Sequence, residues 1–454
     1  MSFNITHDIF IKQNPYKLFF KIAVPGSIGM LASALYGLID GLFVSNFLGQ
    51  TAFSAVNIAY PFVFLTYAVP DLIGIGSSVI IAIKQGEGKK QEADRIFTGA
   101  IIAIFTVCLI LGLLFTFTSP YLIKMVGASG VLAEYAKNYL AIYSMFLPIS
   151  GFVFALDNFL RISHFVKTSM FINILMSLII ILLEYLFIGV LHLGVFSAAL
   201  AACCGFTFAV ICSFIPFVFK KTNLHFTKPE FHVKEALLVI KNGTPTFLNN
   251  ISGKVISIIF NTLLLSLGGE EAVATYGILM YVDWLIIPLL YGMCDSMQPC
   301  IGYNYGANEK NRIKIFRNII FFAALFLCLI AFILCLLIPT EIVKVFTNSQ
   351  SSEEFILMAK NALIIFSFNY LFRWFAYASQ SFFQATGKPL LSASVSISYT
   401  FIFPLILIGV LYSFGLIGLW LNIPISALLT AILAFILLIV DYKRNSKKVQ
   451  NIKY

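Results

Sequence analysis

Long apolar segments recur along the whole chain, and they decide what it can fold into. Segments of 18 or more mainly apolar residues are each long enough to cross about 30 Å of hydrocarbon as a helix. Of the 454 residues, 60% are hydrophobic and 11% are charged, against about 25% charged in soluble proteins. A transmembrane β-barrel would show weaker alternating segments of about ten residues. The pattern therefore predicts an all-α polytopic protein of the lipid bilayer.

The apolar segments predict twelve transmembrane helices in two pseudo-symmetric six-helix lobes. The net charge is +10, and most lysines and arginines fall on one side of this arrangement, which predicts that both termini are cytoplasmic. The basic balance thus reflects topology, and we expect no nucleic-acid partner. The N-terminus lacks the basic start of a signal peptide. The predicted spans are about 16–46, 53–83, 95–118, 132–159, 167–190, 195–219, 236–266, 272–302, 312–338, 354–383, 389–412 and 416–440.

The two halves repeat each other at an offset of about 220 residues. Pro25 corresponds to Pro245, and the glycine-containing ends of spans 2 and 8 correspond at 86–88 and 304–306. We predict an N-lobe at 1–219, a cytoplasmic loop at 220–234 and a C-lobe with a basic tail at 235–454. Parallel repeats of six helices are typical of transporters that rock two halves around a substrate site.

Acids inside apolar spans are the candidate functional residues, because each is expensive to insert. Asp40 and Glu184 have no base within a helical turn, so each can take up a proton or coordinate a cation such as Na⁺; the alternative for any one of these acids is a structural carboxylate near a helix end or paired to a base. Asp157 has two interpretations, a coupling role or an i,i+4 pair with Arg161. Asp71 follows Pro70 near a possible kink. Asp283 and Asp295 have possible partners in Lys254 and Arg373.

Aromatic and methionine side chains could line a cavity for flat cationic ligands through stacking and cation–π contacts. Packing or contact with lipid is the alternative for any one of them. The candidates lie in spans 1 and 2 and in the chain's eighth span: Tyr36, Tyr60, Phe64, Tyr67, Met280, Tyr281, Trp284, Met293 and Gln298.

Enzymatic chemistry has little support in the sequence. The eight cysteines lie in apolar spans and are interpreted as packing residues. The histidines are dispersed, and no spacing suggests a metal site. No Walker A motif is present. We therefore expect neither an enzyme nor a bound cofactor or metal site.

Two strings resemble the multidrug and toxic compound extrusion (MATE) family. The first is Tyr36-Gly-Leu-Ile-Asp40-Gly-Leu-Phe-Val after Pro25, and the second is Gln298-Pro-Cys-Ile-Gly-Tyr-Asn-Tyr-Gly. The resemblance implies a cation-coupled antiporter that exports organic, often cationic small molecules by alternating access. It also implies that ion binding at Asp40 bends helix 1 near Pro25, the expected hinge.

Departures from the family pattern refine this expectation. Gly253 is not acidic and span 10 has no acid after Glu354, so the chain resembles the DinF-like branch, with coupling at Asp40, Glu184 and Asp157. Ile180 and Ala202 replace oxygen donors of the family's Na⁺ site, which favours H⁺ over Na⁺. We expect a monomer in the plasma (inner) membrane. The alternative is a flippase for lipid-linked precursors, which would need a cationic cavity.

Overall fold

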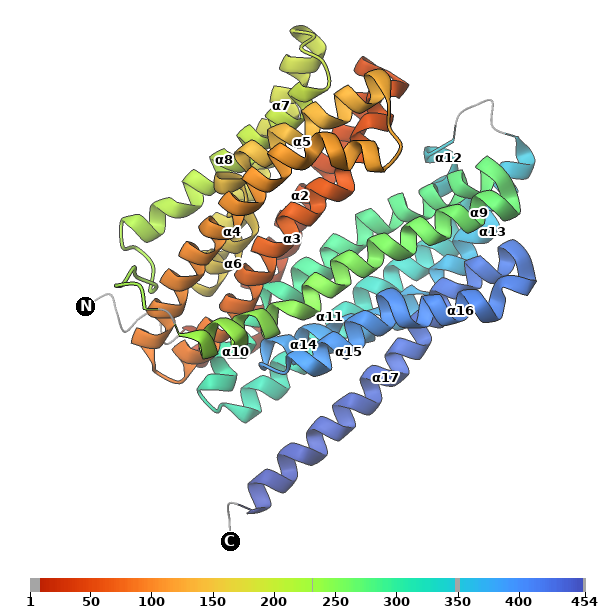
Figure 1. The fold of residues 1–454 in the computed structure, drawn as a ribbon. Coiled ribbons are helices and arrows are strands. Elements are labelled where there is room, and N and C mark those ends of the chain that lie inside the picture. The colour runs from red at the N-terminus through yellow and green to blue at the C-terminus, as the bar shows by residue number, and fades with distance from the viewer. Residues whose placement is uncertain (1–8, 231, 348–351, 452–454) are drawn as a thin grey trace. The chain divides into compact units, whose positions relative to one another are not determined.

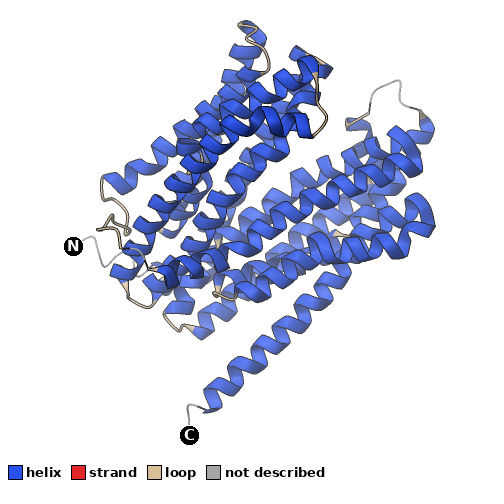
Figure 2. Ribbon diagram, viewed as in Figure 1, coloured by secondary structure: helices blue, strands red, loops and turns tan. Residues whose placement is uncertain are grey.

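The computed structural model describes residues 9–230, 232–347 and 352–451. These ranges contain helices, turns and loops but no β-strand (Figures 1 and 2). The helices are α2 (Pro15–Phe43), α3 (Gln50–Gly86), α4 (Lys90–Met125), α5 (Gly130–Ser150), α6 (Val153–Ile162), α7 (Val166–Glu184), α8 (Phe196–Val218), α9 (Val233–Ser296), α10 (Gln298–Gly306), α11 (Lys310–Leu337), α12 (Pro339–Val345), α13 (Glu353–Ser367), α14 (Tyr370–Ala385), α15 (Pro389–Ile397), α16 (Phe403–Leu411) and α17 (Gly415–Asn451).

Local sequence explains where several helices begin and end. Asn14 caps α2 by accepting hydrogen bonds from the backbone N–H groups of Tyr16 and Lys17, and Pro15 takes the first helical position. α9 reverses at Gly269, whose φ of 64° suits glycine. Gly415, with a φ of 61°, separates α16 from α17 in the same way.

The predicted twelve-helix membrane fold is confirmed. Among the described residues, nine helical stretches are long and apolar enough to cross a membrane, and the pair α13–α14, bent by 45°, makes ten. Two of these, 233–306 and 389–444, each turn back at a glycine and supply two crossings. Interruptions inside spans were not predicted: α5 gives way to α6 after Ser150, and α13 gives way to α14 after Ser367.

The chain forms two compact units. Unit 1 comprises 1–247 and 296–313, and unit 2 comprises 248–295 and 314–454. Unit 1 therefore includes the start of α9, all of α10 and the start of α11. The division at 220–234 was predicted from the internal repeat and concerns the two repeated halves of the sequence. It stays a prediction.

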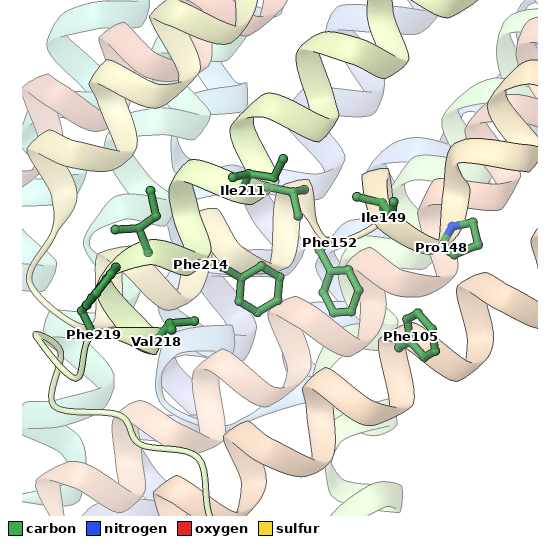
Figure 3. Close-up of a pocket in the computed structure, with 10 residues that line it drawn as sticks. Phe105, Pro148, Ile149, Phe152, Ile211, Phe214, Val218 and Phe219 are labelled. Carbon is green, nitrogen blue, oxygen red and sulfur yellow. The ribbon is translucent and has the colours of Figure 1, made fainter.

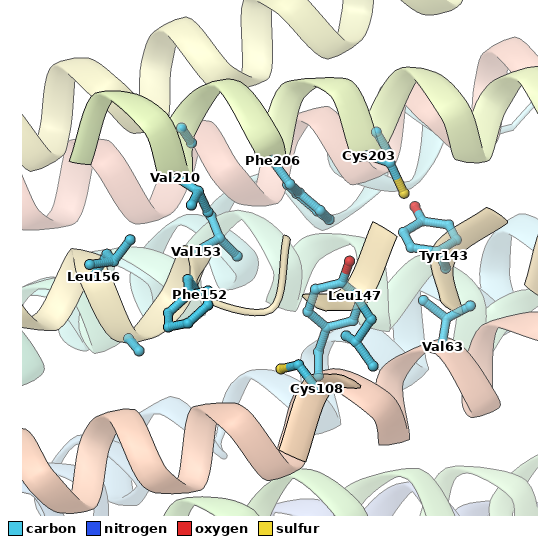
Figure 4. Close-up of a cluster of buried hydrophobic side chains, with 14 of the residues drawn as sticks. Val63, Cys108, Tyr143, Leu147, Phe152, Val153, Leu156, Cys203, Phe206 and Val210 are labelled. Atoms are coloured by element: carbon cyan, nitrogen blue, oxygen red, sulfur yellow. The ribbon is translucent and has the colours of Figure 1, made fainter. Parts of the chain in front are cut away.

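The core of unit 1 is a continuous apolar cluster contributed mainly by α3, α4, α5, α6, α7 and α8. Figure 4 shows part of it, with Cys108 and Cys203 among aliphatic and aromatic side chains. All eight cysteines of the chain are free thiols, and six of them are buried. This agrees with their interpretation as packing residues.

Glycines allow two close helix crossings inside unit 1. A Cβ atom on Gly86 would lie 2.0 Å from the carbonyl oxygen of Tyr303, and one on Gly306 would lie 2.0 Å from that of Ile83. Gly76 and Gly243 make an equivalent crossing between α3 and α9. Backbones can approach this closely only where side chains are missing.

The N-terminal segment 9–13 is fixed to the same end of unit 1. Phe10 is buried, with its ring centroid 4.1 Å from that of His164 and 5.6 Å from that of Tyr303. Arg312 donates hydrogen bonds to the carbonyl oxygens of Phe10 and Gln13 at 2.9 and 2.8 Å. We call this end, which also carries Lys84, Lys89, Lys90 and Arg95, the basic end of unit 1.

Candidate functional site

Asp40 and Glu184 lie on two helices of unit 1 that pack side by side. Asp40 is in the last third of α2, and Glu184 is the final residue of α7. The Ser177 hydroxyl of α7 donates to the carbonyl oxygen of Ala32 in α2 at 3.1 Å. Gly29 allows Asn173 to approach the α2 backbone. This packing brings together two acids that are far apart in the sequence.

The carboxyl groups of Asp40 and Glu184 are within hydrogen-bonding distance of each other. Glu184 is fully buried, and neither of its oxygens has an N–H or O–H donor among the described residues; one Asp40 oxygen also lacks such a donor. None of the ion pairs found among residues 9–230, 232–347 and 352–451 involves either acid. Two carboxylates in contact repel each other unless a proton or cation lies between them.

Tyrosines surround this carboxyl pair. The side chains of Tyr36, Tyr60 and Tyr139 interact electrostatically with Asp40, and those of Tyr36 and Tyr139 also interact with Glu184. Tyr139 and Tyr143 are hydrogen-bonded to each other, with ring centroids 5.2 Å apart. Phenol groups can donate to a carboxylate or accept from a carboxylic acid. The pair therefore sits among groups that tolerate a change of its protonation state.

Sequence reasoning missed Tyr139 and Tyr143. Their i,i+4 spacing was visible and places them on one helix face. Nothing in the sequence indicated that this face turns toward span 1.

Tyr67, another aromatic candidate of unit 1, is connected to Tyr36 through the ring of Phe206. The hydroxyl of Tyr67 is 2.6 Å from that of Ser150, and its ring lies 5.7 Å from that of Phe206. Phe206 in turn lies 6.1 Å from Tyr36. Tyr60 is exposed and Phe64 is half-buried. Tyr36 and Tyr67 thus share Phe206 as a neighbour, whereas their part in substrate binding stays a prediction.

A π-helical turn follows each of the two acids. η1 (Val44–Leu48) comes shortly after Asp40, and η2 (Tyr185–Val190) comes directly after Glu184. Gly189 of η2 brings this turn close to the ring of Phe47 in η1. Such turns are rare and occur often at functional sites. No sequence signal used above predicted them.

Asp157 belongs to a separate polar cluster. It forms an ion pair of 2.6 Å with Arg161, as the i,i+4 interpretation predicted, and accepts hydrogen bonds from Ser169 and Asn173. Arg161 is almost fully buried and also donates to Ser296 at 3.1 Å. Each charge therefore has a partner, in contrast with Asp40 and Glu184.

Unit 2 has its own intramembrane ion pair. Arg373 of α14 lies 2.8 Å from Asp283 of α9 and 5.1 Å above the ring of Tyr399. Asp295, near the end of α9, accepts hydrogen bonds from Tyr377 and Ser381 at 2.7 and 3.0 Å. Of the two possible basic partners that the sequence offered, Lys254 and Arg373, Asp283 pairs with Arg373.

The remaining predicted residues are placed as follows. Met280 is half-buried, Trp284 is exposed, and Tyr281 is exposed with its ring stacked 5.7 Å from that of Phe346. Gln298 starts α10 in unit 1 and is half-buried. Pro25 is buried inside α2, which continues through it. Asp71 is half-buried in α3.

No group of three histidine, cysteine, aspartate or glutamate side chains is close enough to hold a metal ion, as far as the described residues show.

The comparisons with known proteins agree with this arrangement. The MatE family pattern matches residues 25–186 and 245–410. The chain belongs to the MATE family. The two matched segments begin at Pro25 and Pro245, one in each half, at the offset of 220 that the internal repeat predicted.

Relatives of this MATE protein span nearly its whole length. The multidrug export protein MepA of Staphylococcus aureus is 26% identical over 443 residues, which is 94% of each chain. MepA of Staphylococcus saprophyticus is 25% identical over 84% of this chain and 83% of its own. A MATE in complex with MaL6 has a TM-score of 0.90 at 23% identity, covering 95% of this chain and 97% of its own. A transporter of the MOP superfamily from Pyrococcus furiosus, described as having a binding pocket of reverse polarity, has a TM-score of 0.88 at 22% identity, with 95% and 96% covered.

Proposed function

We propose that this MATE protein is a cation-coupled antiporter that exports organic cationic or amphiphilic compounds by alternating access, with Asp40 as the coupling carboxylate. The contact between Asp40 and Glu184 carries the proposal. An ion held between two acids in an apolar helix pair changes the local charge when it leaves. Such a charge change biases a two-state helix arrangement, which is what coupled transport requires.

The relatives support the substrate class. The two MepA relatives are named multidrug export proteins, and their matches cover 84% and 94% of this chain. The aromatic candidates of unit 1 suit flat cations through cation–π contacts: Tyr36, Tyr60, Phe64 and Tyr67. We propose that Met280, Tyr281, Trp284 and Gln298 also contact the substrate.

We propose Pro25 as the hinge of helix 1. It lacks an N–H and so leaves one carbonyl of α2 without its usual donor. Structural neighbours include a MATE in the bent conformation, one in the straight conformation and one in which a proline is mutated to alanine. The π-helical turns η1 and η2 offer a second place where α2 and α7 can change their hydrogen bonding.

The coupling ion is proposed to be H⁺. Ile180 and Ala202 are buried and apolar, so neither supplies an oxygen to a cation near Asp40 and Glu184. Na⁺ prefers several oxygen ligands, whereas a proton needs only the two carboxyl groups. Asp157 is proposed as a secondary coupling residue, and the hydrogen bonds that it accepts from Ser169 and Asn173 of α7 position α6 against α7.

We also propose the orientation, location and assembly of the protein, and the orientation rests on the distribution of lysines and arginines. The basic end of unit 1 faces the cytoplasm, both termini are cytoplasmic, and the protein acts as a monomer in the plasma (inner) membrane. The flippase alternative needs a cationic cavity, yet the guanidinium of Arg373 is in an ion pair with Asp283. Antiport of organic cations is therefore favoured.

Flux measurements in liposomes test the proposal. The purified protein is reconstituted, ΔpH and Na⁺ gradients are imposed separately, and ethidium movement is followed by fluorescence. We expect ΔpH alone to drive ethidium transport. Asp40→Asn and Glu184→Gln should each abolish the coupled flux while the protein still folds. The control Glu134→Gln changes an acid of α5 that is distant in sequence from both and should transport normally.

The outcomes separate the components of the proposal. If Na⁺ but not ΔpH drives the flux, the coupling role of the two carboxyl groups still holds, but the coupling ion is Na⁺ and not H⁺. Normal transport by Asp40→Asn would remove Asp40 as the coupling group. Absence of flux with any cationic dye under either gradient would overturn the antiporter proposal.

A further inference from the structure

A hollow of about 400 Å³ opens on the surface of unit 1 between α4, α5 and α8 (Figure 3). Every side chain that lines it is apolar, and several are large and exposed, so the hollow opens away from the core. Its volume falls within the range of roughly 300–1,000 Å³ that is typical of small-molecule sites. The lining includes Phe105, Pro148, Ile149, Phe152, Phe214 and Phe219.

The hollow lies where the fourth span is interrupted. α5 ends at Ser150 and α6 begins at Val153, so Phe152 occupies the break and points into the hollow (Figure 3). Gly151 is tightly packed, since a Cβ atom on it would lie 2.4 Å from the Sγ atom of Cys108. The backbone path, rather than mobile side chains, therefore sets the shape of the hollow.

The helices around the hollow are long and apolar enough to cross a membrane. Its lining comes from α4, α5, the α5–α6 break, and α8 with its end, all within or beside membrane-spanning stretches. If the hollow is empty, its lining side chains lose van der Waals contacts. Water is a poor occupant, because no polar group lines the hollow to hydrogen-bond with it. An acyl chain is the occupant that fits both conditions.

One end of the hollow carries positive charge. Phe219, which lines it, is followed directly by Lys220 and Lys221, and both lysines are exposed. The Lys221 N–H donates to the carbonyl oxygen of Pro216 at 2.9 Å, and the Lys220 N–H donates to that of Phe217 at 3.1 Å. These bonds fold the two lysines back onto the last turn of α8, with Lys220 in the left-handed region at a φ of 53°. The backbone of both lysines is thereby held within about a helical turn of Phe219, from where their side chains can reach the mouth of the hollow.

We propose that this hollow is a binding site for one anionic phospholipid. Its acyl chain lies against Phe152 and Phe214, and its phosphate lies at Lys220 and Lys221. Basic groups beside a transmembrane groove select anionic headgroups. The bound chain fills the space at the α5–α6 interruption and so stabilises unit 1. This site is independent of the transport cycle proposed above.

Native mass spectrometry of the purified full chain tests the site. The protein in detergent is titrated with phosphatidylglycerol and, separately, with phosphatidylcholine of the same acyl chains. We expect one phosphatidylglycerol to bind at least tenfold more tightly than phosphatidylcholine. Lys220→Gln and Lys221→Gln should each weaken phosphatidylglycerol about fivefold and leave phosphatidylcholine unchanged. Ile211→Trp, which places a larger ring in the hollow, should weaken both lipids.

Matched controls use positions outside the hollow. Lys314→Gln removes an exposed lysine of α11, and Leu113→Trp adds the same ring to an exposed position of α4; neither should change lipid binding. Thermal melting verifies that each variant folds, and Ile215→Phe replaces Ile211→Trp if that variant does not. Equal affinity of the native chain for the two lipids, or unchanged phosphatidylglycerol binding in both lysine variants, would overturn the proposal.

Discussion

Gly86 and Gly306 occupy equivalent positions in the two halves of the chain and pack against each other's helices without room for a side chain. A Cβ on either glycine would come within 2.0 Å of a carbonyl oxygen on the opposite helix. The contact is reciprocal, as expected where two repeats meet about a pseudo-two-fold axis. It joins the end of α3 to the end of α10 inside unit 1.

Gly306→Ala should therefore destabilise the protein. The new methyl group meets backbone rather than a flexible side chain, so the helices must separate, at a cost of about 1–3 kcal/mol for overpacking. Thermal melting in detergent measures the loss. Gly99→Ala is the matched control, because Gly99 lies inside α4 and a Cβ atom on it would meet nothing within 4 Å. That variant should be neutral or more stable by about 0.5–1 kcal/mol. Equal melting of the two variants would refute the close crossing.

Substitution of Arg373 should cost more than substitution of a surface base. Arg373 and Asp283 are mostly buried, and removal of one partner from a buried pair costs about 3–5 kcal/mol. Arg373→Met should thus lower the free energy of unfolding strongly, and Arg373→Met combined with Asp283→Leu should recover much of the loss. Lys84→Gln, which removes a partly exposed partner of Glu92, should change it by less than about 1 kcal/mol. Chemical denaturation of these variants, together with Asp283→Leu alone, gives the comparison; additive losses in the double variant would show that the two residues are not coupled.

The contrast between the ion pairs shows how much the sequence could predict. Asp157 and Arg161 are four residues apart on one helix, so their pair was predictable from helix geometry alone. Asp283 and Arg373 were recognisable as possible partners, but 90 positions separate them, and only helix packing decides between Arg373 and Lys254.

The sequence was enough to predict that Asp40 and Glu184 are functional acids, but not that their carboxyl groups are in contact. Asp40 and Glu184 stood out because each is an acid without a nearby base in an apolar helix. Their contact depends on how α2 lies against α7, which hydrophobic patterning does not specify. The π-helical turns after both acids and the surrounding Tyr139 and Tyr143 depend on the same packing. The twelve spans, in contrast, follow from length and hydropathy alone.

Phe10→Ala should release the N-terminal segment without unfolding unit 1. The ring of Phe10 is buried beside His164 and Tyr303, so its removal takes away the main apolar contact of the segment. Hydrogen–deuterium exchange should rise at residues 9–13 and stay low in α3 and α10. Phe20→Ala, at an exposed position of α2, serves as the control and should leave exchange at 9–13 unchanged. Unaltered protection in Phe10→Ala would mean that the hydrogen bonds from Asn304 and Arg312 to the backbone suffice to hold the segment.

Infrared spectroscopy should detect the proton that Asp40 and Glu184 share. A hydrogen bond between two carboxyl groups needs one proton, so the native chain should show a carboxylic-acid band in Na⁺-free buffer at neutral pH. Asp40→Asn and Glu184→Gln should each shift that band, because the remaining buried acid stays protonated but now faces an amide instead of a second carboxyl group. Asp157→Asn should keep it, since Asp157 is already paired with Arg161. If Na⁺ occupies the pair instead, adding Na⁺ should remove the band from the native chain. A spectrum that is identical in the native chain and in all three variants would show that no proton is held there.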